Sequence, residues 1–210
     1  MVALIGIDCA TQPRKVGLAL AELDGEIIRI KACRTASPRE EPAWIVSRWM
    51  GQYGTALLAL DAPAAHELFR RQTDDAIHQR FNKRPLEVGA NFISRTAVAA
   101  LNLLDQLRLI TGQSIPLAWS PADLQQSAAI EVYPAATRLA HGSKARGGSI
   151  EGLESLMDLS AFDGELPASG DAIDALVCVV AAADFIQGLA RPPVDRETAQ
   201  QEGWIWTAEI

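Results

Sequence analysis

The pattern of apolar and polar positions divides the chain into short apolar runs and longer stretches with helical periodicity. Three apolar runs fall within the first 33 residues, and the Asp24-Gly25 dipeptide separates the second from the third. That dipeptide favours the type I′ turn of a β-hairpin. The runs therefore predict three strands in an antiparallel meander, at residues 2–7, 16–23 and 26–33.

Beyond the meander, apolar residues recur at the spacing of helices, and two further short runs predict strands. The last helix is apolar on nearly every side after its first turn, which predicts that it is buried. The predicted helices span 41–52, 91–110, 121–126 and 171–187, and the further strands span 56–60 and 129–133.

The order of these elements predicts one α/β domain over residues 1–210. Strands that return through helices imply parallel pairs with right-handed crossovers, so the sheet should be mixed and flanked by helices. Residues 62–90 are irregular and mildly basic, which predicts a functional loop or lid near the site. Residues 203–207 fit either a late edge strand or an apolar tail that docks on the body.

Composition narrows the function classes. The 210 residues carry a formal net charge of −7, so binding of nucleic acid through bulk positive charge is excluded and any such role needs a local basic surface. The three cysteines form no CxxC motif and no cluster with histidine, which argues against zinc, and their odd number argues against a disulfide framework. No signal peptide or membrane-spanning run is evident, so we expect a cytoplasmic protein without a membrane partner.

Two predicted strands run directly into an aspartate, Asp8 after the first and Asp61 after the fourth. In open α/β sheets, ligands bind beyond the carboxyl ends of the strands. If these strands are neighbours, two like charges meet there, and a proton or a cation must offset them. Mg²⁺ or Mn²⁺ suits such oxygen ligands. The alternative is that each aspartate only begins a turn.

The first turn of the last predicted helix holds Asp171 and Asp174, whose i, i+3 spacing places both on one face. Acidic residues are common there because the helix dipole favours them. Asp174, however, opens a helix that must be buried, and a buried charge needs a partner. Glu131, within the strand at 129–133, fits a solvated face and a site-facing position equally well.

Together these segments resemble a bacterial family of predicted ribonuclease H-like nucleases, a domain-of-unknown-function group. More remotely, residues 171–176 are similar to the last acidic motif of Holliday-junction resolvases of the RuvC type. The resemblance implies a ribonuclease H-like mixed sheet and maps the metal-binding roles onto Asp8, Asp61, Asp171 and Asp174. One departure is Asp61, where those resolvases carry a glutamate. The matching segments are 6–8, 60–63, 71–84, 131–134 and 171–176.

These features predict a metal-dependent phosphodiester hydrolase, a nuclease acting on nucleic acid or on a small phosphate ester. Two metal ions would clamp the phosphate, with Asp8 bridging them. The alternatives are a non-catalytic binding module of the same fold and, with less support, an actin-like or sugar-kinase-like phosphotransferase. The predicted catalytic set is Asp8, Asp61, Asp171, Asp174 and Glu131, and the predicted substrate-binding set is Arg71, Arg80, Lys83 and Arg84.

The tryptophans give no indication in the sequence that bases stack on them. Trp44, Trp49, Trp204 and Trp206 are predicted to lie in the core, and Trp119 fits either a core or a surface position.

Overall fold

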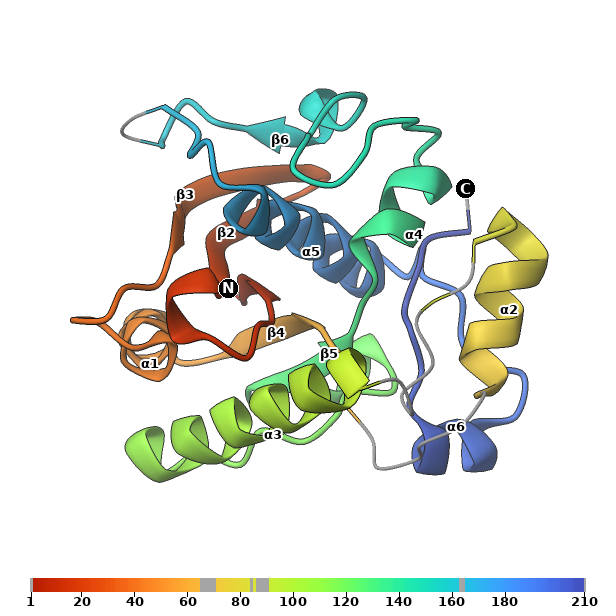
Figure 1. The fold of residues 1–210 in the computed structure, drawn as a ribbon, viewed down its shortest axis with the longest axis horizontal. Helices are drawn as coiled ribbons and strands as arrows, with labels where there is room; N and C mark the ends of the chain where they lie inside the picture. Colours follow the sequence, from red (N-terminus) through yellow and green to blue (C-terminus); the bar gives the residue numbers. More distant parts are fainter. Residues whose placement is uncertain (1, 65–70, 84, 86–90, 163–164, 210) are drawn as a thin grey trace.

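A single mixed sheet forms the centre of the molecule (Figure 1). The computed structural model describes residues 2–64, 71–83, 85, 91–162 and 165–209. The sheet has six strands in the order β5-β4-β1-β2-β3-β6. The strands are β1 (Ala3–Asp8), β2 (Gly17–Asp24), β3 (Ile27–Thr35), β4 (Ala56–Asp61), β5 (Ala128–Glu131) and β6 (Met157–Asp158).

Strands β1, β2 and β3 pair antiparallel, whereas β4 pairs parallel with β1, and β5 pairs parallel with β4. This is the meander followed by parallel strands that the sequence predicts, so the ribonuclease H-like fold class is confirmed. The prediction of a type I′ turn between β2 and β3 is wrong. Only Gly25 has a positive φ in the two-residue loop Gly25–Glu26, and a positive φ at the first central residue alone is the type II′ pattern.

Helices cover both faces of the sheet, with α5 on one side and α1 and α3 on the other (Figure 1). None of the helices in the described residues has the length and apolar character needed to cross a membrane. The α-helices are α1 (Pro42–Tyr53), α2 (Gln72–Phe81), α3 (Asn91–Thr111), α4 (Pro134–Ala140), α5 (Gly170–Ile186) and α6 (Arg196–Glu202); η1 (Pro13–Lys15), η2 (Pro121–Asp123) and η3 (Glu154–Leu156) are 3₁₀ helices.

The side chains of β1 alternate between two apolar clusters. Leu4 packs in the cluster that contains α5, whereas Ile5 and Ile7 pack in the cluster that contains α1 and α3. All three are fully buried. A strand covered on both faces has no solvated side, which explains why its sequence is almost continuously apolar.

Two glycines let α5 approach the sheet closely at the end where Asp8 lies. A Cβ atom on Gly6 would lie 1.9 Å from the carbonyl oxygen of Ala175, and one on Gly17 would lie 1.8 Å from that of Asp171. Gly17 is the strand partner of Asp8. The missing side chains therefore bring the first turns of α5 to the carboxyl end of β1.

Replacing Gly17 by alanine should destabilise the fold by about 1–3 kcal/mol, because the added methyl group meets backbone that cannot move aside freely. Chemical denaturation would measure the change. Gly51→Ala is the matched control: Gly51 lies in α1 with no atom within 4 Å of its added Cβ, and alanine favours helix there. Equal stability of the two variants would contradict the close approach of α5.

The prediction that residues 62–90 are irregular is wrong over 72–81, which form α2. This helix is mostly polar and packs through a small apolar cluster of Ile77, Ala136 and Ile205. Such a sparse apolar face gives little periodic signal, so tertiary contacts decide the helix. Within the predicted lid, residues 65–70, 84 and 86–90 lie outside the described residues.

The C-terminal segment 203–207 docks on the body of the protein rather than adding a full strand. Ile205 forms an isolated parallel bridge with Glu131, and Trp204 and Trp206 are buried. The predicted helix at 121–126 is reduced to the single turn η2.

The core position predicted for Trp44 is wrong, because 57% of this side chain is exposed. Helix α1 buries Ile45 and Met50 against the sheet. Trp44 and Arg48 are four residues apart and share the solvent face of the helix.

Candidate active site

Asp8 and Asp61 are direct register partners at the ends of the parallel strands β1 and β4. Because parallel strands present their carboxyl ends at the same edge of a sheet, the two carboxylates come together there. Both residues are half-buried. The sequence-based expectation that these two strands are neighbours is confirmed by the strand order.

Helix α5 adds Asp171 and Asp174 to the same edge. The backbone of Asp171 touches Gly17, which is paired with Asp8. Asp174 lies one helical turn further along, and its charge acts on both strand-end aspartates. The structure therefore brings together the four aspartates that the sequence singled out.

Burial and mutual repulsion raise the pKa values of the strand-end aspartates. The pKa of Asp8 rises to about 9, first because the carboxyl is desolvated and then because Asp61, Asp174 and Asp171 lie near. The pKa of Asp61 rises to about 7 through burial and through the charges of Asp174 and Glu131. In the absence of a bound cation, this edge therefore retains protons that isolated aspartates would lose near pH 4.

A cation of the protein itself, Arg138 of α4, lies against this cluster. Its Nη2 contacts Oδ1 of Asp174, and its Nε donates to the carbonyl of Ser149 at 2.9 Å. The amide of Gly148 also donates to Oδ1 of Asp174, at 2.9 Å. Arg138 lowers the pKa of Asp8 and of Asp61, yet both stay raised. Sequence reasoning missed Arg138 because its short helix leaves no periodic signal.

The donor chemistry of the cluster fits a hard divalent cation, because it offers carboxylate oxygens with more negative charge than Arg138 offsets. Among the described residues, no group of three or more histidine, cysteine, aspartate or glutamate side chains is arranged so that it could hold a metal ion.

Beside Asp61 lies a buried ion-pair network centred on Arg71. Its guanidinium donates to Oε1 and Oε2 of Glu131 at 2.8 and 3.0 Å and to Oδ1 of Asp74 at 3.0 Å. Only 2% of Arg71 is exposed. Its donors are directed at internal carboxylates, and Arg71 also lines the cavity beside Asp61, so its contact with substrate stays a prediction. Glu131 also accepts from the amide of Ala64 at 3.2 Å, which makes it a structural partner next to Asp61.

Residues 6–198 match the model of the family described as Protein of unknown function (DUF429). The chain belongs to this family. The resemblance to a domain-of-unknown-function group is thereby confirmed. No curated protein sequence matches the chain significantly. Among solved structures, T. thermophilus RuvC in complex with a Holliday junction substrate is similar, with 14% identity and a TM-score of 0.47, over 92% of this chain and 100% of that chain.

The remaining basic residues predicted to bind substrate are dispersed in this DUF429 member. The guanidinium of Arg80 lies 4.8 Å from the ring centre of Phe81, whereas Lys83 is exposed to solvent. Arg84 lies outside the described residues. Of the described members of the predicted basic set, Arg71 lines the cavity beside Asp61, whereas Arg80 and Lys83 do not.

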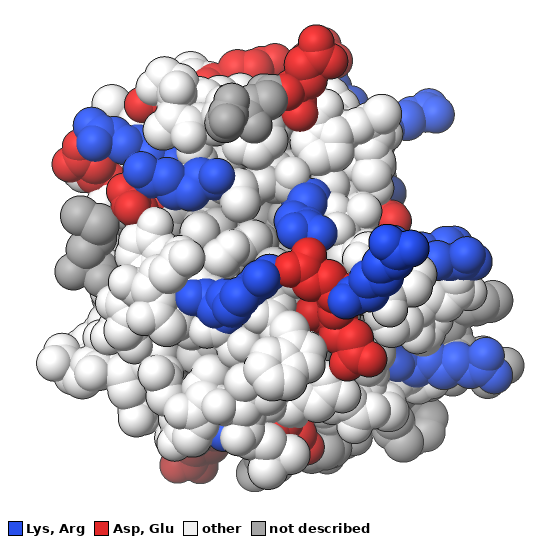
Figure 2. Space-filling model, turned by 90° about the vertical axis from the view of Figure 1, so that its left-hand side faces the viewer, with Lys and Arg blue, Asp and Glu red and all other residues white. Residues whose placement is uncertain are grey.

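A second group of charges lies on the side of the molecule where α1 is found. Figure 2 shows basic side chains around acidic ones on this face. Glu40 pairs with Arg34 at 2.8 Å and also contacts Arg48. The single carboxylate of Glu40 therefore offsets only part of the charge of these two arginines.

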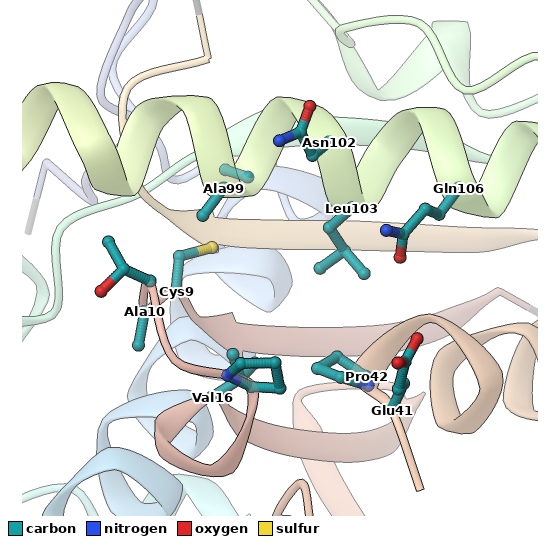
Figure 3. A pocket seen from close by; sticks show the side chains of 12 residues that line it. Cys9, Ala10, Val16, Glu41, Pro42, Ala99, Asn102, Leu103 and Gln106 are labelled. Atoms are coloured by element: carbon teal, nitrogen blue, oxygen red, sulfur yellow. The ribbon is translucent and has the colours of Figure 1, made fainter. Parts of the chain in front are cut away.

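Two cavities of this DUF429 chain meet the loop that follows β1, and Cys9 lines both. One, of about 240 Å³, borders Asp61, Glu131 and Tyr133. The other, of about 220 Å³, lies between the loop after β1, the start of α1, and α3 (Figure 3). The first offers space for a ligand beside Asp61, whereas none of the four aspartates lines the second.

Proposed function

We propose that the chain is a divalent-metal-dependent phosphodiester hydrolase, a nuclease acting on nucleic acid or on a small phosphate ester. The observation that carries the proposal is the pairing of Asp8 with Asp61 at adjacent strand ends, under the charge of Asp174. Residues 1–210 would form one domain built around this site.

In this proposal Asp8, Asp61, Asp171 and Asp174 would hold Mg²⁺ or Mn²⁺. A bound divalent cation supplies electrostatic stabilisation of the charge that develops on a phosphate. Asp8, whose pKa is raised to about 9, would give up its carboxyl proton when it becomes a ligand. Arg138 would keep Asp174 oriented toward the cluster through its contact with Oδ1.

The test is a cleavage screen with single-stranded and duplex DNA, RNA, branched junctions and dinucleotides, in Mg²⁺, Mn²⁺ or EDTA. We expect cleavage of at least one substrate with metal and none in EDTA, and at least about a tenfold loss in Asp61→Asn, since a lost ligand weakens charge stabilisation. Asp105→Asn is the control, because Asp105 is an exposed acid on α3. Cleavage of no substrate, or equal cleavage by Asp61→Asn, would contradict the proposal.

A second candidate is a non-catalytic binding module with the same fold. The observation in its favour is that Arg138 and the Gly148 amide already engage Asp174, so the protein itself satisfies part of the cluster. Binding of a ligand that EDTA leaves unchanged, together with no cleavage in the screen, would favour this candidate.

A further inference from the structure

The 220 Å³ cavity between the loop after β1, the start of α1, and α3 begins one residue from the carboxylate cluster. Cys9, which follows Asp8 directly, lines this cavity as well as the one that borders Asp61. No aspartate lines this cavity, so a ligand that fills it and also reaches the carboxylates must extend past Cys9.

The cavity combines apolar walls with hydrogen-bonding groups at one end. Val16, Pro42 and Leu103 form apolar walls. Figure 3 shows Gln106 and Glu41 near one end of the cavity and Cys9 near the other. The amide of Gln106 both donates and accepts, whereas the carboxylate of Glu41 only accepts. This lining suits a flat ring with apolar faces and polar edges.

Two cations flank the same loop. Arg14 and Lys15 lie in η1, between the cavity-lining residues Pro13 and Val16, and both are exposed. Neither belongs to the ion pairs formed by described residues. Exposed Arg and Lys side chains near a cavity favour a ligand that carries phosphate.

We propose that this cavity receives the nucleobase of a nucleotide whose phosphate lies at the carboxylates, with Arg14 and Lys15 offsetting its charge. The proposal rests on the proposed function for the position of the phosphate. Sites for drug-sized ligands measure about 300–1,000 Å³, so 220 Å³ suits a single ring system. Glu41 favours bases with an amino group, because a carboxylate accepts from that group.

The proposal also defines the form of the substrate. A base stacked in a duplex cannot enter a cavity, so the base must come from a single strand, from a mononucleotide, or from a nucleotide extruded from its stack. A net charge of −7 agrees with such a small footprint.

The test compares two tryptophan substitutions on adjacent residues of α3. Ala99 lines the cavity and Val98, which is 57% exposed, faces solvent. Binding of GMP, AMP, CMP, UMP and ribose 5-phosphate is measured by calorimetry in Mg²⁺, because the proposal places the phosphate at the cation-loaded carboxylates. We expect the wild type and Val98→Trp to bind at least one amino-bearing nucleotide at least tenfold more tightly than ribose 5-phosphate, and Ala99→Trp to lose this difference.

Gln106→Ala and Glu41→Gln provide second variants at exposed positions, in case the bulky side chain disturbs folding. We expect Gln106→Ala to weaken nucleotide binding and Glu41→Gln to reduce the preference for amino-bearing bases over UMP. Ribose 5-phosphate binding as tightly as the nucleotides, no binding of any nucleotide at millimolar concentration, or unchanged binding by Ala99→Trp and Gln106→Ala would each overturn the proposal.

The same measurements separate this inference from the nuclease proposal. Nucleotide binding that depends on Ala99 but occurs in a protein with no metal-dependent cleavage would keep the base subsite and remove the nuclease function. Metal-dependent cleavage that Ala99→Trp leaves unchanged would keep the nuclease function and remove the subsite.

Discussion

Replacing Asp8 by asparagine should remove most of the affinity for Mn²⁺ and, in metal-free protein at pH 8, raise thermal stability. Asp8 lies at the centre of the cluster, with Asp61, Asp174 and Asp171 all raising its pKa. Asparagine keeps the shape of the side chain but removes one charge. We expect Mn²⁺ affinity, measured by calorimetry, to fall at least about 100-fold, since loss of a ligand should exceed the 10–100-fold typical of outer-shell changes.

The stability part of this prediction follows from the direction of the pKa shift. The pKa of Asp8 is about 9 in the folded protein and 3.8 ordinarily, so folding favours the protonated carboxyl. That contribution is fully present below about pH 4 and is lost as the pH rises toward 9. The asparagine of the Asp8→Asn variant has no such proton to lose. The melting temperature of this variant in EDTA at pH 8 should exceed that of the wild type by at least about 2–4 °C, or about 1 kcal/mol.

The control for this experiment is Asp105→Asn, which changes the same net charge at an exposed position of α3. Identical Mn²⁺ binding by wild type and Asp8→Asn would contradict the metal site. If the melting temperatures of the wild type and of Asp8→Asn both stayed constant as the pH changed, this result would contradict the close approach of the four aspartates.

Replacing Arg71 by alanine should destabilise the protein by about 3–5 kcal/mol, because it leaves Glu131 and Asp74 buried without their cation. Burial already raises the pKa of Glu131, and Arg71 opposes that rise. Without Arg71 the carboxyl takes up a proton more readily. The loss of stability, measured by urea denaturation, should therefore be smaller at pH 5 than at pH 8.

Lys83→Ala is the control for Arg71→Ala, because Lys83 is an exposed cation beyond the same helix. Arg71→Lys adds a second comparison: it keeps the charge but not the paired donors, so its cost should be intermediate. A loss below about 1 kcal/mol in Arg71→Ala, typical of a surface ion pair, would show that the network is not buried in solution.

The sequence by itself predicted the elements that carry strong periodicity. The apolar runs before Asp8 and Asp61 specified two strands, because strands buried on both faces must be apolar throughout. The sequence of α5 is likewise apolar on nearly every side, which predicted a buried helix. Since these three elements hold all four aspartates, the candidate site followed from the sequence once β1 and β4 were expected to be neighbours.

The tertiary structure decided the features that depend on contacts between distant residues. The burial of Arg71, the contact of Arg138 with Asp174 and the exposure of Trp44 follow from packing, which no local pattern encodes. The arginines belong to short or mostly polar segments, where few apolar positions mark the structure.

At the aspartates, too, the sequence determined one part of the arrangement and the fold determined the other. The sequence determined which carboxylates end the strands and open the helix. Only the fold shows that Gly6 and Gly17 let α5 approach, since a glycine in a strand has many causes and the helix that each one meets lies far along the chain. Local periodicity thus specified the elements, and close packing between them specified the distances on which the chemistry depends.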